Sequence, residues 1–161
     1  MEIYLRSLNE QDAKISYQWR NNPKVWRNTR FKPLEAISLQ LEQEWIKLAL
    51  TNKDEKRFAI CIKETNEYIG NGQLTDIIEG RAQYHIFIGE VKYWGMGIGK
   101  RVAWLVLDYA FNTLGLKEVY AYFKPENIAS IKACEKNGFI FKEVVNGELL
   151  FICQKESFNM N

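Results

Sequence analysis

The sequence predicts an α+β fold in which helices pack on one mixed β-sheet. Three observations support this class. Segments in which apolar and polar residues alternate, as they do in strands, occur at the start, centre and end of the chain. In the middle, a strand, a glycine-rich turn and a helical pattern precede another strand, which indicates a crossover unit. Asn146-Gly147 separates two alternating segments and predicts a hairpin.

The first half of the chain predicts four strands and two helices. A strand covers residues 3–8, and Asn9 or Asp12 caps a helix that runs to about Trp19. Asn21, Asn22 and Pro23 end that helix. After Pro33, one buried helical face is predicted from the spacing of Leu34, Ile37, Leu41, Trp45 and Leu48. Three strands follow: RFAICIK, YIGNGQLTDII with its glycine interruptions, and AQYHIFIG.

The second half predicts two further helices, a strand and the final hairpin. One buried helical face comprises Val102, Leu105, Val106, Tyr109 and Ala110. The strand KEVYAYF leads to the helix NIASIKACEKNG, which Asn127 opens and Gly138 closes. The hairpin pairs FIFKEVV with ELLFICQK. No repeat or linker divides the chain, so residues 1–161 are expected to form a single domain.

Composition argues against several classes of function. The net charge of +2 gives no global field for nucleic acid, and the longest apolar run, near ~10 residues, is too short to cross a bilayer. The N-terminus lacks the pattern of a signal peptide. Three separated cysteines and one histidine predict reduced thiols, a cytoplasmic location and no metal site.

The stretch YWGMGIGKR, residues 93–101, is the strongest candidate for a binding site. A glycine-rich turn before a helix lets an anion approach unpaired backbone N–H groups, and the helix dipole adds positive charge. Lys100 and Arg101 add two cations. The expected ligand is therefore a phosphate or pyrophosphate.

Two common phosphate loops fit this stretch poorly. A Walker A loop requires Ser or Thr after Gly-Lys, but Arg101 follows Lys100. A Rossmann turn requires a third glycine at position 100 or 102, where Lys100 and Val102 stand.

The WGMGIG loop, followed about thirty residues later by N-x-x-S-x-x-x-C-E-K-N-G-F, resembles the GNAT-type N-acetyltransferases. Their loop is usually Q/R-x-x-G-x-G/A, and Trp94 stands at the Gln/Arg place here. The resemblance extends from LRSLNEQDA to the final hairpin. It implies a GNAT-like, mixed and mostly antiparallel sheet of six to seven strands, with splayed central strands and about four helices.

The resemblance also implies acetyl-CoA as the co-substrate and an acyltransferase activity. Asn127 and the backbone of the glycine loop are expected to hold CoA, and the strand before the loop is expected to pair with the pantetheine amides. The implied cofactor-binding residues are Ile86, Phe87, Ile88, Met96, Gly97, Ile98, Gly99, Lys100 and Asn127. An ordinary tight turn before a helix is the alternative interpretation of the loop.

The groups that move protons are less clear from the sequence. Members of the family often use a Tyr in the second signature to protonate the leaving thiolate, and Cys134 occupies that place here. Cys134 could pack under the cofactor, donate a proton or act as a nucleophile. Tyr120 and Tyr122 are substitutes for the donor.

The general base is similarly open. The family often uses a Glu on the strand before the loop, where this chain has Gln83, which cannot accept a proton. His85 lies two residues on, hence on the same strand face, and an ordinary imidazole ionises near ~6.5. A hydrogen-bonded His in the cleft wall is the alternative role. Glu90 and Glu143 are weaker candidates for the base.

The acceptor site is expected before the central strands, where residues 19–33 carry five cations and no acid. The WRN-x-P pattern resembles the Rim-type branch, which includes enzymes for ribosomal-protein, spermidine, aminoglycoside and nucleotide amino-sugar amines. Trp19, Arg20, Arg30 and Gln83 are the predicted acceptor-binding residues. Guanidinium and ring side chains favour an anionic carrier such as a nucleotide-linked amino sugar; a solvated basic loop is the alternative.

Other acceptors remain open. The carboxylates Glu35, Glu42 and Glu44 on the next predicted helix are compatible with a cationic acceptor. A protein N-terminus, a polyamine and an aminoglycoside are alternative acceptors, and a catalytically silent CoA-binding module is an alternative of another class. No partner beyond a small-molecule amine is expected, neither nucleic acid nor membrane; the oligomeric state, a homodimer included, is left open.

Overall fold

The computed structural model describes residues 1–26 and 35–159. Their strands form one seven-stranded sheet in the order β1-β2-β3-β4-β5-β7-β6. The strands are β1 (Ile3–Ser7), β2 (Lys56–Ile62), β3 (Tyr68–Ile78), β4 (Arg81–Ile88), β5 (Glu118–Phe123), β6 (Ile140–Val145) and β7 (Glu148–Gln154). Adjacent strands are antiparallel except for the parallel pair β4 and β5. The expected mixed, mostly antiparallel sheet is confirmed.

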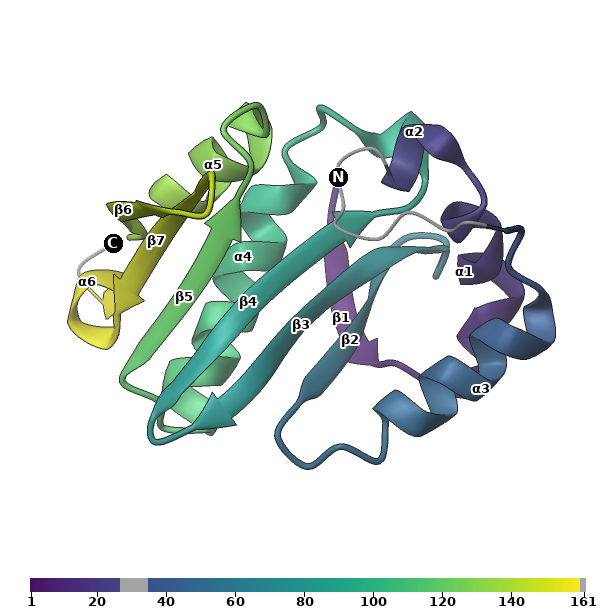
Figure 1. The fold of residues 1–161 in the computed structure, drawn as a ribbon, viewed down its shortest axis with the longest axis horizontal. Coiled ribbons are helices and arrows are strands. Elements are labelled where there is room, and N and C mark those ends of the chain that lie inside the picture. Colours follow the sequence, from purple (N-terminus) through teal and green to yellow (C-terminus); the bar gives the residue numbers. More distant parts are fainter. Residues whose placement is uncertain (27–34, 160–161) are drawn as a thin grey trace.

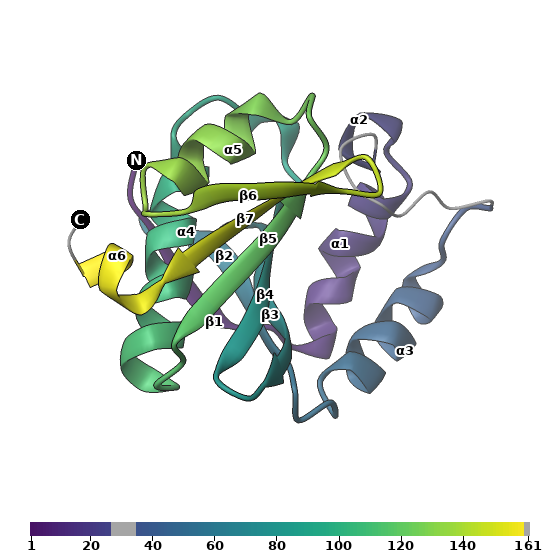
Figure 2. The same cartoon turned by 60° about the vertical axis from the view of Figure 1, so that its left-hand side comes forward.

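Helices cover both faces of this sheet. The α-helices are α1 (Ala13–Arg20), α2 (Pro23–Trp26), α3 (Leu39–Ala49), α4 (Ile98–Asp108), α5 (Ile128–Glu135) and α6 (Lys155–Asn159). Short 3-10 turns cover Glu10–Asp12 and Val91–Tyr93, and a π-helical turn, Tyr109–Thr113, extends α4. The short α2 and α6 were not expected from the sequence. In Figure 2, α4 and α5 lie on one side of the sheet and α1 and α3 on the other.

Two apolar clusters hold these layers together. The larger packs α4, through Val102, Val106 and Leu107, against the sheet. The smaller joins Trp19 of α1 and Ile46 of α3 to β2 and β3. Burial of this apolar surface is the main force that fixes both helical layers on the sheet.

The first helix begins where the sequence places a cap, although through a 3-10 turn. The Asn9 side chain accepts a hydrogen bond from the Gln11 backbone at 2.9 Å, and Asp12 accepts one from the Asn9 backbone at 2.9 Å. Asp12 also binds Arg6 of β1 at 2.7 Å. Asn9 is therefore the cap, and Asp12 ties α1 to the first strand.

The buried face predicted for α3 is wrong. The helix starts after the Ser38 cap, and Leu41, Trp45 and Leu48 are exposed. Its buried side chains are Glu42 and Ile46. The spacing rule fails because Glu42 finds partners in α1, which makes its burial favourable. Leu34, also part of the predicted face, lies outside the described residues.

The parallel strands β4 and β5 pair only at their beginnings. Their ladder joins Arg81, Ala82 and Gln83 to residues 118–120, and the strands diverge beyond it, as Figure 1 shows. After Gln83, the backbone edge of β4 that faces β5 is not paired with β5 or with another strand of the described residues. This opening positions the site described next.

Candidate active site

The glycine loop has the backbone conformation that glycine permits. Gly95 and Gly97 have φ angles of 75° and 78°, in the left-handed region. A Cβ atom at either position would meet no atom within 4 Å, so conformation rather than lack of space requires these glycines. Gly97 is also the N-cap of α4. The first N–H groups of that helix have no intrahelical partner and are available to an anion.

This loop forms one wall of a cavity of about 440 Å³. The cavity lies between β4, the loop, the first turn of α4 and α5. Every cofactor-binding residue expected from the sequence lines it: Ile86, Phe87, Ile88, Met96, Gly97, Ile98, Gly99, Lys100 and Asn127. Asn127 precedes α5, and its side chain does not cap that helix. We call this space the loop cavity.

Asn137, which the sequence reasoning did not single out, fixes the two helices beside the loop cavity. Its side-chain nitrogen donates to the Lys100 carbonyl at 3.0 Å and to the Ala133 carbonyl at 2.9 Å. A Cβ atom on Gly99 would lie 3.7 Å from that of Ala133, at ordinary contact distance. The buried amide therefore connects the start of α4 to the end of α5.

Trp94 anchors the glycine loop, and Arg101 does not line the cavity beside it. The Trp94 indole donates to the Ile88 carbonyl at 2.8 Å and ties the loop to the end of β4. Arg101 lies over the Trp104 ring, 4.9 Å from its centroid, and is not part of the cavity wall. Of the two neighbouring cations Lys100 and Arg101, Lys100 alone lines the loop cavity.

A second cavity, of about 360 Å³, opens on the other side of the splay. We call it the acceptor-side cavity. Its walls come from α1, α2, α3 and all the strands from β2 to β5, with Ser130 of α5 and Glu148 of β7 completing them. The two cavities share Tyr84, Ile86, Phe87, Asn127 and Ser130. They therefore meet at the place where β4 and β5 separate.

Trp19 connects the helical wall of the acceptor-side cavity to the end of β4. Its indole donates to the Glu90 carboxylate at 3.0 Å and packs against Phe87. A Cβ atom on Gly89 would lie only 1.9 Å from the Trp19 ring. Gly89 is thus required for close approach, a role that the sequence did not reveal because the glycine lies at the end of a strand.

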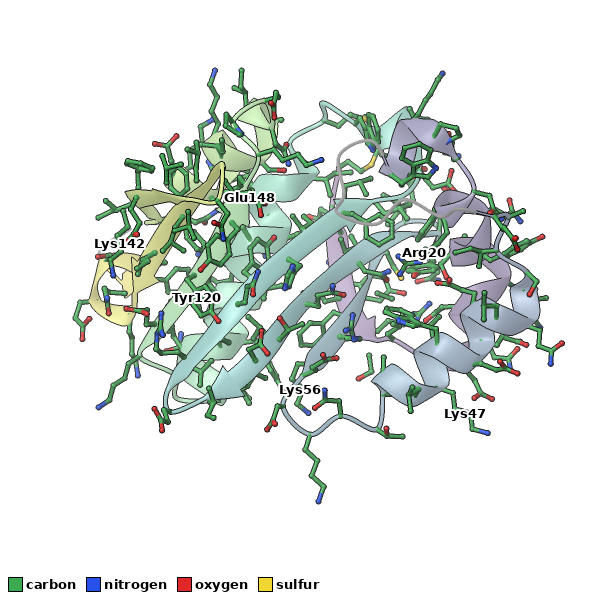
Figure 3. All side chains as sticks on the ribbon, viewed as in Figure 1. Arg20, Lys47, Lys56, Tyr120, Lys142 and Glu148 are labelled. Carbon is green, nitrogen blue, oxygen red and sulfur yellow. The ribbon has the colours of Figure 1, made fainter. Side chains whose placement is uncertain are left out.

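Two arginines that line the acceptor-side cavity both contact the Trp45 ring. Their guanidinium carbons lie 4.7 Å (Arg20) and 5.0 Å (Arg57) from the indole centroid. Arg20 also binds Glu42 at 3.2 Å, and Arg57 binds Glu55 at 2.7 Å. In Figure 3, Arg20 and Glu148 lie on opposite sides of β4. The carboxylates hold both guanidinium groups in place at the wall.

His85 lines the acceptor-side cavity, and its Nε2 lies 2.9 Å from the Thr75 hydroxyl oxygen. The hydrogen bond fixes the ring, and the tautomer decides which atom donates. Gln83 is buried at the last β4–β5 pair and lines neither cavity. The two residues lie on the same face of β4, but of the two only His85 lines the acceptor-side cavity.

Cys134 is the buried residue of α5 and lines the loop cavity. Burial raises the pKa of its thiol well above the ordinary value of 9.0, with smaller contributions from Cys153 and Glu135. The thiol is therefore neutral at physiological pH. A neutral thiol is a poor nucleophile, because the thiolate is the reactive form.

The other predicted site residues are dispersed. Arg30 lies outside the described residues. Tyr120 and Glu143 line neither cavity, whereas Tyr122 lines the acceptor-side cavity. The Glu90 carboxylate accepts a hydrogen bond from the Trp19 indole, and the buried Glu42 carboxylate accepts hydrogen bonds from Ser16 and Arg20. Of the three carboxylates named for a cationic acceptor, Glu42 is thus already occupied.

Two features are absent from the described part of the chain. No group of three or more His, Cys, Asp or Glu residues within it is placed to hold a metal ion. No helix within it combines the length and apolar character needed to cross a membrane.

Comparisons with known proteins agree with this geometry. A family model described as "Acetyltransferase (GNAT) domain" matches residues 2–140. The chain is 32% identical over 151 residues to spermidine N(1)-acetyltransferase of Escherichia coli K12, covering 92% of this chain and 76% of that protein. It is 29% identical over 140 residues to uncharacterized N-acetyltransferase p20 of Bacillus licheniformis, covering 85% and 78% of the two chains.

Solved structures show the same fold. Spermidine N-acetyltransferase from Vibrio cholerae, in complex with CoA and spermine, superposes with a TM-score of 0.85 at 22% identity, covering 99% of this chain and 98% of that one. A domain from Methanocaldococcus jannaschii superposes with a TM-score of 0.80 at 24% identity, covering 95% and 98%.

Proposed function

The chain belongs to the GNAT acetyltransferase domain family, and on that premise we propose that it acetylates the primary amine of a small molecule held in the acceptor-side cavity. It is an acetyl-CoA-dependent N-acetyltransferase. The expected GNAT membership, enzyme class and co-substrate are thereby confirmed. The acceptor and the roles of individual residues are proposals.

The observation that carries the proposal is the junction of the two cavities. Acetyl-CoA in the loop cavity places its pyrophosphate at the start of α4, where unpaired backbone N–H groups bind anions. Its pantetheine arm follows the unpaired edge of β4. The thioester then lies where β4 and β5 diverge, next to the acceptor-side cavity. Holding both substrates together makes direct transfer efficient without an acyl-enzyme.

In this arrangement His85 is the candidate general base. The attacking amine must be neutral, and the imidazole lines the cavity in which the amine is held. Thr75 orients the ring through the 2.9 Å contact. The imidazole takes the proton from the amine directly or through one water molecule.

For the acceptor, we propose an amine on an anionic carrier, of the class of nucleotide-linked amino sugars. Arg20, Arg57 and Lys124 line the acceptor-side cavity, against the single carboxylate Glu148 in its described wall. Guanidinium groups held by carboxylates are already oriented for a phosphate or carboxylate. Trp19 and Trp45 supply flat apolar surface against which a base or sugar can pack.

A polyamine is the second candidate, and a specific observation favours it. The relative at 32% identity over 92% of the chain is a spermidine acetyltransferase. Glu148 could meet one ammonium group of such an acceptor. Because Glu42 and Glu55 pair with Arg20 and Arg57, and Glu148 stands against Lys124, net charge does not separate the two candidates. The anionic carrier rests on the two oriented guanidinium groups and the flat indole surfaces of the wall.

A thiol-release assay with acetyl-CoA and a panel of amines tests the proposal. The panel contains nucleotide-linked amino sugars, spermidine, spermine, an aminoglycoside and peptides with a free N-terminus. Release above the no-amine rate is expected with a nucleotide-linked amino sugar. Arg57→Gln should raise KM for that acceptor about tenfold or more, as a charged hydrogen bond is lost.

The same variant separates the two candidates. Loss of a cation should leave KM for a polyamine unchanged or lower it, because a repulsive charge is removed. Turnover with spermidine alone would assign the chain to the second candidate. CoA binding without release with any amine would instead indicate a catalytically silent module.

A further inference from the structure

Tyr84 carries a buried polar group that the fold does not use. The side chain is 2% exposed, and its hydroxyl oxygen has no hydrogen-bond partner among the described residues. Most buried hydroxyl groups in proteins are hydrogen-bonded, and an unpaired one destabilises the folded state. Tyr84 therefore requires an explanation other than stability.

Its position in the sheet is informative. The last β4–β5 pair joins Gln83 to Tyr120, so Tyr84 is the first residue of β4 after the strands separate. Tyr84 is also among the five residues that line both cavities. The ring packs near Phe139, with centroids 6.2 Å apart, and Cys134 lines the loop cavity together with Tyr84.

The neighbouring polar groups are less suited to act on the thioester. Cys134 offers a thiol, which is a weak hydrogen-bond donor. His85 contacts Thr75 and lines only the acceptor-side cavity. Tyr120 stacks with Arg81 and lines neither cavity. Tyr84 and Ser130 both carry a hydroxyl group and line both cavities, and of these two only Tyr84 is a buried residue whose hydroxyl oxygen lacks a partner.

We propose that the Tyr84 hydroxyl donates a hydrogen bond to the thioester sulfur of acetyl-CoA as the carbon–sulfur bond breaks. The inference rests on the proposed transfer at the cavity junction. The amine nitrogen forms a bond to the acetyl carbon, and the electron pair of the breaking bond stays on sulfur. The phenol stabilises that negative charge and keeps its proton. Solvent later protonates the thiolate, and the amine proton leaves through His85 or water.

The electrostatics of the site fit a donor of this kind. Burial, and to a smaller extent Cys134, raises the pKa of Tyr84 well above its ordinary value of 10.0. The phenol therefore stays protonated throughout the usual assay range. A preorganised neutral donor aimed at developing charge is an effective catalytic device, because it needs no reorganisation during the reaction.

The test compares Tyr84→Phe with Tyr68→Phe. Tyr68 is likewise buried, but its hydroxyl has a partner, Asn71, at 2.6 Å, and it lines neither cavity. For each variant, the midpoint of thermal unfolding, the CoA dissociation constant, kcat and both KM values are measured with the best amine of the panel.

Opposite results are expected for the two variants. Tyr84→Phe should lower kcat about 10²-fold or more, leave the CoA dissociation constant within a factor of about two, and unfold at the same or a higher temperature. Tyr68→Phe should unfold at a lower temperature and keep kcat within a few-fold of wild type.

The remaining outcomes distinguish a failure of the proposed function from a failure of the role proposed for Tyr84. If wild type releases no thiol with any amine, the proposed function fails before the variants are compared. If wild type is active and Tyr84→Phe keeps its kcat, the role of Tyr84 is overturned while the proposed function stands. A lower unfolding temperature together with unchanged kcat would assign the hydroxyl to a structural hydrogen bond.

Discussion

Cys134 stands where the family often has a tyrosine, and its surroundings decide between the roles left open by the sequence. The side chain is 1% exposed, and burial keeps the thiol protonated. These facts favour packing beneath the cofactor over nucleophilic attack. We therefore expect the acetyl group to pass directly from CoA to the amine.

The first prediction concerns Cys134→Ala. Turnover should fall only a few-fold, because the change removes a small packed group and no reactive thiolate. Initial rates with both substrates varied should give intersecting lines. Parallel lines, together with a Cys134→Ala variant that has lost all activity, would show that the thiol carries the acetyl group.

His85 gives the second prediction. His85→Gln keeps approximate size and hydrogen-bonding capacity but removes basicity, so kcat should fall about 10²–10⁴-fold while CoA affinity is unchanged. The rise of kcat with pH that reflects loss of the imidazole proton should disappear. Thr75→Val is the matched variant, because it removes only the contact that orients the ring. A His85→Gln enzyme within a few-fold of wild type would make His85 a wall residue.

The third prediction concerns pH and stability. Burial raises the pKa of Cys153 from 9.0 to about 12. The unfolded chain therefore ionises this thiol at lower pH than the folded chain does. Stability should be complete below about pH 9 and fall as pH rises toward about 12, by up to about 1.4 kcal/mol per pH unit for one thiol.

Urea unfolding at pH 8 and pH 10 under reducing conditions measures this loss. Cys153→Ala is the control, because other groups also titrate over the range. The variant should lose less stability than wild type between the two pH values. Equal losses would mean that the thiol is not protected by the fold.

At the scale of the elements, the loop before α4 and the end of β4 set the geometry of the site. The sequence predicted the loop because glycines at close spacing before a helical pattern are a local signal. The cofactor-binding residues came from the family resemblance, and their role stays a prediction. It did not predict that Trp19 packs on Gly89 or that Asn137 joins α4 to α5. Those contacts join residues 70 and 37 positions apart and leave no local pattern.

The face of α3 shows a second limit of sequence patterns. The apolar residues of that helix predicted its buried side, yet Glu42 is buried there through Arg20 and Ser16. A polar residue can be buried wherever a partner from another helix satisfies it. Strands β2 to β7 were predicted well, and in β5 more and less buried residues alternate as the two faces of a sheet require.

The fourth prediction tests the loop as the site of the CoA pyrophosphate. Gly97→Asp should raise the CoA dissociation constant at least about tenfold relative to Gly97→Asn. Asp and Asn have similar shapes, and both tolerate the left-handed conformation of residue 97. The difference between them therefore isolates the negative charge. Calorimetry measures binding, and equal affinity in the two variants would contradict the assignment.

The fifth prediction concerns the contact between α1 and β4. Gly89→Ala should destabilise the protein by about 1–3 kcal/mol, since the new methyl group overlaps the Trp19 ring. It should also raise KM for the acceptor amine, because Trp19 lines that cavity. Gly99→Ala is the control for stability: its methyl group meets Ala133 at ordinary distance, so unfolding should not become easier. Equal stability of the two variants in urea would contradict the close approach.

At the scale of the whole molecule, the splay of β4 and β5 organises function. In the proposed arrangement, one helical layer and the glycine loop would hold the co-substrate on one side of the sheet, and α1 and α3 would form the acceptor wall on the other. The two cavities share residues at the opening between the strands, and we propose that the two substrates meet there. On this proposal the fold allows direct transfer, and the acceptor-side walls select the amine.

The most direct test of this account follows an isotopically labelled acetyl group by mass spectrometry. The protein is incubated with labelled acetyl-CoA, first alone and then with the best amine of the panel. The account predicts no label on the protein without the amine, and label on the amine when both substrates are present. Label retained on Cys134, or an amine that stays unlabelled while CoA binds the loop cavity, would contradict direct transfer at the junction of the two cavities.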